Sequence, residues 1–264
     1  MLTDPKANRI RGVAKLLKKD ARTQSGLFLL EGPQGLKELV ASPQQVREVY
    51  ATADCLERYD AEFASLDRAG IDIQSVSERV LETLSDTKTP QGVVAVCRQL
   101  DVSLDQVMAH QPKLVAVLSQ IRDPGNAGTV LRAADAAGAD AVIFTESSVD
   151  VYNPKVVRST AGSLFHVPVV TGVAALDVIS QLQAAGVQVL AADGGGTAIP
   201  ALPKNSLGSP TAWVFGNEAW GFAPEVLAAV DRVVSVPIYG KAESLNLATA
   251  ASVCLFASAM AQRG

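Results

Sequence analysis

Three segments of the sequence carry polar side chains whose types and order could serve chemistry. The first, residues 120–140, contains a Pro-Gly turn that is followed by Asn126 and, six residues later, by Arg132. Asn126 has a side chain that suits a helix N-cap, which would place Arg132 in the second turn of the same helix. The two residues are too far apart for i, i+4 stacking, yet both can face the open end of a sheet.

The second segment, residues 213–222, is a strand that runs into a turn. This turn carries Asn217 and Glu218 between two glycines. Polar side chains at the end of an apolar strand could form part of a functional site. The alternative is structural, because Glu218 could form an ion pair with Arg132 while the glycines serve only the turn.

The third segment, residues 237–248, is a strand followed by a loop and the start of a helix, where Ser244 and Asn246 lie. Side chains of these types could bind a substrate or simply cap the helix. Taken by itself, each segment could have a purely structural role, as a helix cap, a turn or an ion pair. It is their joint occurrence that points to a functional site.

Apolar runs in the second half of the chain indicate the sheet that must position these segments. Helical segments separate strand-like runs at residues 114–120, 140–146, 166–171, 187–193, 211–216 and 232–238. Such alternation predicts an α/β fold with a mainly parallel sheet covered on both faces. Ligands bind at the carboxyl ends of parallel strands, so we expect the polar segments at that edge. The glycine triplet 194–196 lacks the spacing of a dinucleotide fingerprint and is weak evidence alone.

The first half of the chain predicts a separate and smaller α/β unit. Short apolar runs alternate with helical stretches from residue 27 to residue 97. The residues that follow are more polar and end at Pro112, which indicates a linker. We therefore expect an N-terminal domain at residues 1–98, a linker at 99–112 and a second domain at 113–264.

A basic segment opens the chain although the whole protein is acidic. Residues 1–22 contain seven Lys or Arg against two Asp, whereas the formal net charge of the chain is -4. This distribution favours attraction to RNA phosphates. The alternative is an amphipathic helix without a partner, because Ile10, Val13, Leu16 and Leu17 form an apolar stripe. The predicted RNA-binding residues are Arg9, Arg11, Lys15, Lys18, Lys19 and Arg22.

Composition argues against several classes of protein. The chain has two histidines and three scattered cysteines, so neither a metal site nor a disulfide framework is expected. No apolar run approaches the roughly 20 residues of a membrane span, and no signal peptide is recognisable. We expect a cytoplasmic protein without membrane contact. The Ala-rich last segment predicts a closely packed helix that serves a dimer contact or the core.

Together, the three polar segments resemble the signature motifs of one family. They match, in order and separation, an N-x-G…R motif, a G-x-E-x-x-G motif and an I-x-G…S-L-N motif. On these motifs the chain is identified as a member of the SpoU (TrmH-like) family of SPOUT methyltransferases over residues 113–262. The segments F-L-L-E-G and T-P-Q-G-V-V-A-V resemble the family's N-terminal substrate-binding domain, a small ribosomal-protein-like α/β fold. Residues 156–169 resemble a further family block of less defined role.

The resemblance implies a trefoil-knotted methyltransferase domain that binds S-adenosylmethionine within the knot. Knots are rare, and nothing in the apolar pattern would predict one. Backbone amides of loops can hold the adenine and methionine parts of this cofactor without charged side chains. The residues that the resemblance assigns to the cofactor are Leu190, Ala191, Asp193, Gly194, Phe215, Gly216, Asn217, Gly221, Ile238, Gly240, Leu245 and Leu247.

The resemblance also implies 2′-O-ribose methylation of RNA, with a catalytic set of Asn126, Arg132, Glu218, Ser244 and Asn246. Arg132 matches the family's catalytic arginine, but a guanidinium keeps its proton in proteins. We therefore expect Arg132 to bind the phosphate beside the target ribose and to make the 2′-hydroxyl more acidic. Asn126 and Asn246 would orient the ribose and Arg132. Glu218 would fix Arg132 or a loop, and Ser244 would hold the loop or the substrate.

The implied substrate is 23S rRNA, because the N-terminal domain resembles that of rRNA-directed members, and the implied assembly is a homodimer. Two alternatives within the fold are a tRNA substrate and an RNA-binding module that has lost catalysis. An ordinary dinucleotide-binding enzyme is disfavoured by the missing fingerprint. Trp220, inside the second motif, could stack on a base or pack in a core or a dimer interface.

Overall fold

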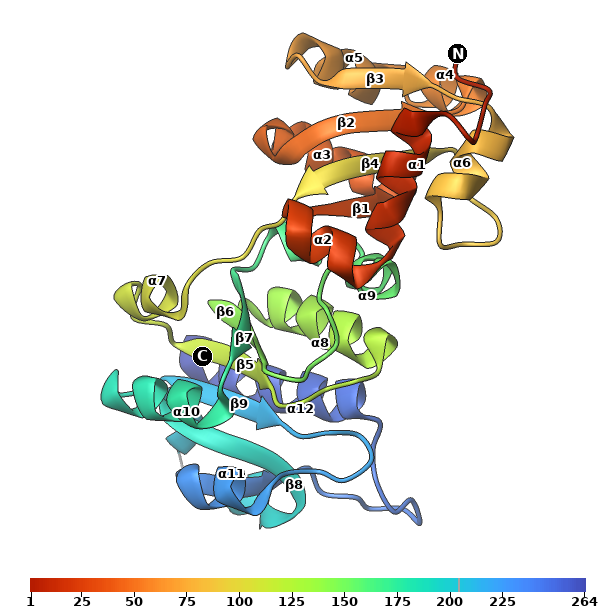
Figure 1. The fold of residues 1–264 in the computed structure, drawn as a ribbon. Coiled ribbons are helices and arrows are strands. Elements are labelled where there is room, and N and C mark those ends of the chain that lie inside the picture. Colours follow the sequence, from red (N-terminus) through yellow and green to blue (C-terminus); the bar gives the residue numbers. More distant parts are fainter. Residues whose placement is uncertain (204) are drawn as a thin grey trace. The chain divides into compact units, whose positions relative to one another are not determined.

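The structure is a computed structural model that describes residues 1–203 and 205–264. The chain forms two compact units, each built around its own sheet (Figure 1). The first unit comprises Met1–Leu100 and Tyr152–Phe165, and the second comprises Asp101–Val151 and His166–Gly264. Among the described residues, no helix is both long and apolar enough to cross a lipid bilayer.

The first unit is a four-stranded sheet in the order β1-β4-β2-β3 with helices packed against it. Strand β4 (Val93–Arg98) runs antiparallel to β1 (Leu27–Glu31) and β2 (Val46–Ala51), and β3 (Asp72–Ser75) pairs in parallel with β2. The α-helices of this unit are α1 (Asn8–Ala14), α2 (Lys19–Ser25), α3 (Leu36–Ala41), α4 (Ala53–Arg58), α5 (Asp60–Arg68), α6 (Glu78–Leu84) and α9 (Pro154–Thr160).

The predicted apolar stripe of the N-terminal segment forms part of the core of this unit. Ile10 and Val13 of α1 are buried, as is Leu16 in the following 3-10 turn, and they pack in one cluster with Leu29 and Val94 of the sheet. Burying these side chains removes apolar surface from water and fixes the helix on the sheet. The basic segment is therefore a folded part of the unit, with an apolar face turned inward.

Residues 152–165 belong to the first unit, which corrects the predicted division of the chain. The ring of Tyr152 lies 4.9 Å from that of Phe28, measured between centroids. Arg158 donates from Nη2 to Asp86 Oδ2 at 3.1 Å. The sequence prediction followed chain continuity and assigned this segment to the second domain. Aromatic packing and a charged hydrogen bond hold it against the first unit instead.

The predicted linker, residues 99–112, is also partly structured. It contains α7 (Leu104–Ala109), which begins with a capping box. Ser103 Oγ accepts from Gln106 N at 3.1 Å, and Gln106 Oε1 accepts from Ser103 N at 2.8 Å. Val107 is buried in the core of the second unit. The polar residues that suggested a linker are thus the cap and exposed face of a short helix.

The second unit is a six-stranded sheet in the order β10-β8-β9-β5-β6-β7, with every pair parallel as predicted. Its strands are β5 (Leu114–Leu118), β6 (Ala141–Thr145), β7 (Val169–Val173), β8 (Gln188–Ala198), β9 (Thr211–Phe215) and β10 (Arg232–Ser235). β5 and β9 are buried along their whole length. Continuous burial explains why these strands are continuous apolar runs in the sequence.

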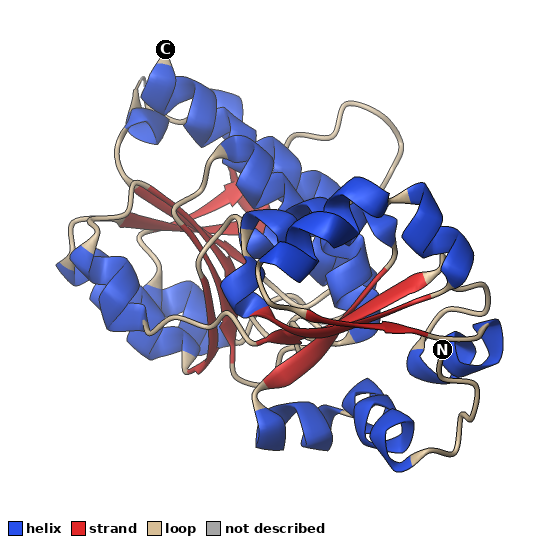
Figure 2. Cartoon of the chain, turned by 90° about the horizontal axis from the view of Figure 1, so that it is seen from above, coloured by secondary structure: helices blue, strands red, loops and turns tan. Residues whose placement is uncertain are grey.

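Helices cover both faces of this sheet (Figure 2). On one face, α7, α10 (Ala175–Ala184) and α11 (Pro224–Ala229) pack with alternate strand residues such as Val115 and Val214. On the other face lie α8 (Pro124–Ala137) and α12 (Leu247–Arg263), which contact each other. Trp213 of β9 is fully buried there and donates from Nε1 to Ser258 Oγ of α12 at 2.9 Å. That bond satisfies the indole N–H and fixes the position of α12.

Candidate functional site

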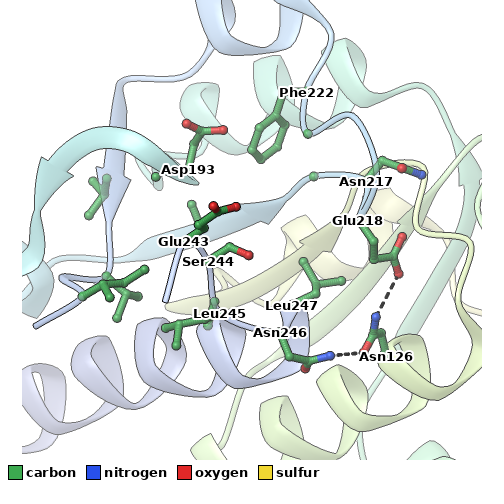
Figure 3. Close-up of a pocket in the computed structure, with 18 residues that line it drawn as sticks. Asn126, Asp193, Asn217, Glu218, Phe222, Glu243, Ser244, Leu245, Asn246 and Leu247 are labelled. Atoms are coloured by element: carbon green, nitrogen blue, oxygen red, sulfur yellow. Dashed lines mark hydrogen bonds between the residues drawn. The ribbon is translucent and has the colours of Figure 1, made fainter. Parts of the chain in front are cut away.

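A cavity of about 380 Å³ lies at the carboxyl ends of β9 and β10, beside the middle of β8. Four stretches of chain line it: residues 192–194, the turn 216–222, residues 234–238, and residues 243–250. Asn126 of α8 adds a fifth wall (Figure 3). Elements far apart in sequence therefore converge at the edge of the sheet where parallel strands bind ligands.

The turn after β9 is rigid because its backbone closes on itself. Asn217 N donates to Gly221 O at 2.7 Å, and Gly221 N donates to Asn217 O at 2.9 Å. A Cβ atom on Gly216 would lie 2.7 Å from that same carbonyl oxygen, so only glycine fits there. The side chain of Asn217 donates from Nδ2 to Gln120 O at 2.7 Å, which ties the turn to the segment after β5.

The glycine triplet forms an irregularity in β8 that opens one wall of the cavity. The pairing of β8 with β10 shifts between Val233 and Val234, so residues 192–196 of β8 have no pairing partner in β10. A Cβ atom on Gly196 would lie 2.5 Å from the backbone of Val233, which excludes any side chain. Asp193 Oδ1 accepts from Gly195 N at 2.9 Å, and Asp193 lines the cavity. The bulge thus brings an acidic side chain and a bare backbone to the cavity.

One residue from each of the three polar segments meets at the mouth of the cavity (Figure 3). Asn126 Nδ2 donates to Glu218 Oε1 at 3.3 Å, and Asn246 Nδ2 donates to Asn126 Oδ1 at 3.0 Å. The side-chain oxygen of Asn246 is not free for a ligand, because it caps α12 by accepting from Ala248 N at 2.9 Å. We call Asn126, Glu218 and Asn246 the polar triad.

The structure corrects the expected role of Asn126 as a helix cap. The N-cap of α8 is Asp123, whose Oδ1 accepts from Asn126 N at 2.7 Å. Asn126 lies in the first turn, and its side-chain amide bonds to the other two members of the triad instead. A preceding Asp at the cap therefore leaves the Asn side chain available for the site.

Arg132 lies outside this arrangement, contrary to the alternative of an ion pair with Glu218. Glu218 accepts from Asn126 Nδ2, and from the backbone N–H groups of Arg122 at 3.4 Å and Asp123 at 3.3 Å. Arg132 is exposed and has no hydrogen bond or ion pair with any residue that the structure describes. Six residues along an α-helix turn a side chain by about 600°, which leaves Arg132 roughly 120° away from Asn126 and about 9 Å along the axis. Glu218 thus fixes a loop and Asn126.

The cofactor residues expected from the resemblance divide into two groups. Those that line the cavity are Asp193, Gly194, Gly216, Asn217, Gly221, Ile238, Leu245 and Leu247. Leu190, Ala191 and Phe215 are instead buried inside the sheet, paired with neighbouring strands, and Gly240 lies outside the lining. The role of these four residues in cofactor binding stays a prediction.

Several cavity residues were missed from the sequence. They are Ala192, Phe222, Val234, Val236, Glu243 and Ala250, while Ser244 lines the cavity as expected. The one available signal was adjacency, since Phe222 and Glu243 each flank a motif residue. Every charged side chain of the lining is a carboxylate, from Asp193, Glu218 or Glu243. Beside them stand apolar side chains, so the cavity favours a ligand with a cationic group and an apolar body.

The basic segment offers fewer free cations than its sequence suggested. Arg22 is only 2% exposed and donates from Nη1 to Leu16 O at 2.8 Å. Arg9 bonds to Glu48, Asp72 and Tyr50. The hydrogen bond to Asp72 raises the pKa of Arg9, which stays protonated, and its charge is offset by the carboxylates of Glu48 and Asp72. Both side chains are engaged within the fold, and the exposed cations that remain of the predicted RNA-binding set are Arg11, Lys15, Lys18 and Lys19.

Comparison with known families identifies both units. The model of the SpoU rRNA methylase family matches residues 113–256. The model of an MRM3-like substrate binding domain matches residues 7–95. The two matches follow one another along the chain, and the first covers the segments that build the cavity.

Individual relatives match nearly end to end. The 23S rRNA (guanosine(2553)-2′-O)-methyltransferase RlmP of Bacillus subtilis is 33% identical over 95% of this chain and 96% of its own. A 23S rRNA (uridine(2479)-2′-O)-methyltransferase of Streptomyces viridochromogenes is 30% identical over 92% of this chain and 86% of its own. Among solved structures, an AdoMet-bound rRNA methyltransferase from Sinorhizobium meliloti superposes with a TM-score of 0.83 at 28% identity, covering 97% and 96% of the two chains.

Proposed function

We propose, because the chain belongs to the SpoU rRNA methylase family, that it is an S-adenosylmethionine-dependent RNA 2′-O-ribose methyltransferase. The observation that carries this proposal is the polar triad, which joins one residue of each family motif at the mouth of an acidic cavity. S-adenosylmethionine bears a sulfonium and an ammonium group, so carboxylates in the lining suit its charge. Its adenine suits the apolar side chains beside them.

Different cavity residues would bind different parts of this cofactor. We assign the adenosyl part to the turn 216–221 and the loop from Ile238 to Leu247, where backbone groups and apolar side chains face the cavity. Asp193 and Glu243 would face the cationic groups of the methionine part. When bound, the cofactor would supply a sulfonium methyl group for transfer to a ribose 2′-oxygen.

The protein's own residues orient the ribose. Asn126 and Asn246 hold each other through one hydrogen bond, and Glu218 fixes Asn126 and the loop before α8. Preorganised amides at the cavity mouth can position a hydroxyl in line with a methyl group. Ser244 adds a hydroxyl to the same wall. Arg132, exposed and unpaired within the described residues, would bind the phosphate next to that ribose, with the hydroxyl proton leaving to phosphate or water.

We assign 23S rRNA as the substrate, because the relatives named above act on it and match both units of this chain. They methylate a guanosine and a uridine respectively, so the family scaffold does not restrict the base. The first unit would contribute Arg11, Lys15, Lys18 and Lys19 to phosphate binding. A cytoplasmic location, together with ribosomal RNA, is part of this proposal.

We also propose that the protein forms a homodimer and that its second unit contains a trefoil knot. Val253, Phe256 and Met260 of α12 are 42%, 39% and 66% exposed and repeat at helical spacing, which supports a homodimer that covers them. The trefoil knot is supported by family membership and by the return of the chain from β10 to α12, which packs on α8.

The proposal is tested with radiolabelled S-adenosylmethionine and separate pools of 23S rRNA and tRNA. We expect incorporation into 23S rRNA at one linkage that becomes resistant to alkali, because a methylated 2′-oxygen cannot attack the phosphate. Incorporation into tRNA alone would move the assignment to the tRNA alternative. Cofactor binding without transfer to any RNA would indicate the inactive module, and calorimetric binding of NAD instead would overturn the proposal. Leu176→Ala, an exposed truncation on α10, serves as the matched control.

A further inference from the structure

The two tryptophans of the chain differ in their surroundings although only seven residues separate them. Trp213 is fully buried and hydrogen bonded, whereas Trp220 is 53% exposed. The guanidinium carbon of Arg122 lies 5.2 Å from the centroid of the Trp220 ring. A large aromatic side chain that remains half exposed under a cation is a feature that core packing does not explain.

The fold holds this pair beside the cavity. Trp220 lies within the rigid turn, one residue before Gly221 and two after Glu218, and both of these residues line the cavity. Neighbouring Cα atoms are about 3.8 Å apart, so the indole is attached at the cavity margin. Arg122 is fixed by the same carboxylate, because its backbone N–H donates to Glu218 Oε2 at 3.4 Å. Glu218 therefore holds in place both the polar triad and the pair formed by Arg122 and Trp220.

The pair has the chemistry that unpaired nucleotides require. Bases stack on aromatic rings and on guanidinium planes, whatever their sequence. The guanidinium of Arg122 contacts the ring and has no carboxylate partner among the described residues. Its N–H groups, which lie at the edge of the guanidinium plane, thus remain available for a phosphate.

We propose that Arg122 and Trp220 form a stacking platform for an unpaired base of the RNA, next to the ribose that enters the cavity. The platform rests on the proposed function and adds a specific RNA contact to it. A second protein copy is the less suitable occupant, because covering Arg122 in an apolar interface would bury a cation without a partner. A polyanion neutralises that cation instead. Trp220 acts as a substrate-positioning residue and takes no part in binding the cofactor.

Intrinsic fluorescence provides a direct test, because the chain has only two tryptophans. We expect an RNA fragment that contains the methylated site to quench indole emission, since a stacked base contacts the exposed ring. Trp220→Phe should abolish the quenching, because Trp213 is buried. Trp220→Ala should weaken RNA binding about 10- to 100-fold, the range expected when one base stack is removed. Cofactor affinity, measured by calorimetry, should not change.

Further measurements separate the possible failures. Trp220→Phe should restore most of the RNA affinity that Trp220→Ala removes, and Leu176→Ala should bind as the wild type does. Unchanged RNA affinity and KM in an active Trp220→Ala enzyme would overturn the platform and leave the methyltransferase assignment intact. Dissociation of a dimer in that variant would overturn it in favour of a protein interface. Quenching by RNA in a wild-type protein that methylates nothing would uphold the platform and refute the proposed function.

Discussion

Arginines of the first unit and arginines near the cavity have opposite surroundings. In the first unit, Arg9 bonds to two carboxylates, Arg22 is buried against a backbone carbonyl, and Arg158 pairs with Asp86. In the second unit, the guanidinium of Arg132 has no described partner, and that of Arg122 lies over the exposed ring of Trp220. The basic segment has the higher density of charge, yet its arginines largely stabilise the fold. In the acidic second unit, neither Arg122 nor Arg132 has a carboxylate partner among the described residues, whereas Arg263 donates to Gly138 O at 3.1 Å.

Charge density along a sequence is therefore a poor guide to where an anion binds. A paired guanidinium has already exchanged water for carboxylates, and removing those partners costs free energy. An exposed and unpaired guanidinium gains its first strong partner when a phosphate arrives.

Removing Arg132 should have the greatest effect on activity. We expect Arg132→Ala to lower kcat/KM for RNA by about 100-fold or more, the scale seen when one preorganised charge donor is removed. Its melting temperature should match the wild type, since the side chain has no described partner. Arg132→Lys distinguishes a point charge from a planar fork, and near-normal turnover would show that the fork is unnecessary. Arg68→Ala, at the exposed end of α5, is the control.

Removing Arg22 should lower the stability of the protein and leave its RNA binding unchanged. Arg22→Met keeps an aliphatic chain in the buried site but leaves Leu16 O without its donor. We expect the free energy of unfolding to fall by about 2–3 kcal/mol in a urea titration. Arg11→Met, on the exposed side of the same segment, should change it by less than about 0.5 kcal/mol. A stable Arg22→Met protein with weak RNA binding would contradict the contrast between the two regions.

The exposed cations of the basic segment should contribute to the salt dependence of the affinity for RNA. Changing Arg11, Lys15, Lys18 and Lys19 to Gln should reduce the slope of log affinity against log salt by up to about 3, at about 0.7 for each phosphate that is no longer neutralised. Cofactor affinity should stay constant, because the cavity is built from the second unit. Arg9→Gln should leave the slope nearly unchanged. Equal slopes in the fourfold variant and the wild type would show that the segment is only structural.

The strand pattern and the three motifs were sufficient to predict the parallel sheet and the meeting of Asn126, Glu218 and Asn246. Polar residues that follow parallel strands share one edge, so their convergence follows from topology. Helix phase and burial were not accessible in the same way. Arg22 is enclosed because the apolar stripe folds around it, and Arg132 lies away from the triad because six residues of α8 separate it from Asn126.

Domain membership was the other gap between sequence and structure. Residues 152–165 lie between two strands of the second unit in sequence, yet Tyr152 and Arg158 find their partners in the first. Such contacts depend on which surfaces the folded chain exposes, and a local pattern contains no information about them. The cavity residue Glu243 was missed for a similar reason, because only the path of the loop turns it inward.

The pair formed by Arg9 and Asp72 should contribute only slightly to the stability of the fold. The hydrogen bond from Arg9 lowers the pKa of Asp72 below its usual value. A carboxylate with a depressed folded pKa stabilises the protein above its unfolded pKa, about 3.9, and loses that contribution as the pH falls through the folded pKa. Both side chains are largely exposed, so solvent limits the contribution at pH 7 to less than about 1 kcal/mol. We therefore expect Asp72→Asn to be slightly less stable than the wild type at pH 7. Urea titrations at decreasing pH should show the difference in stability begin to shrink below about pH 4 and vanish once the pH lies below the folded pKa of Asp72. A difference that persisted at that lower pH would mean that Asp72 acts through packing and not through its charge.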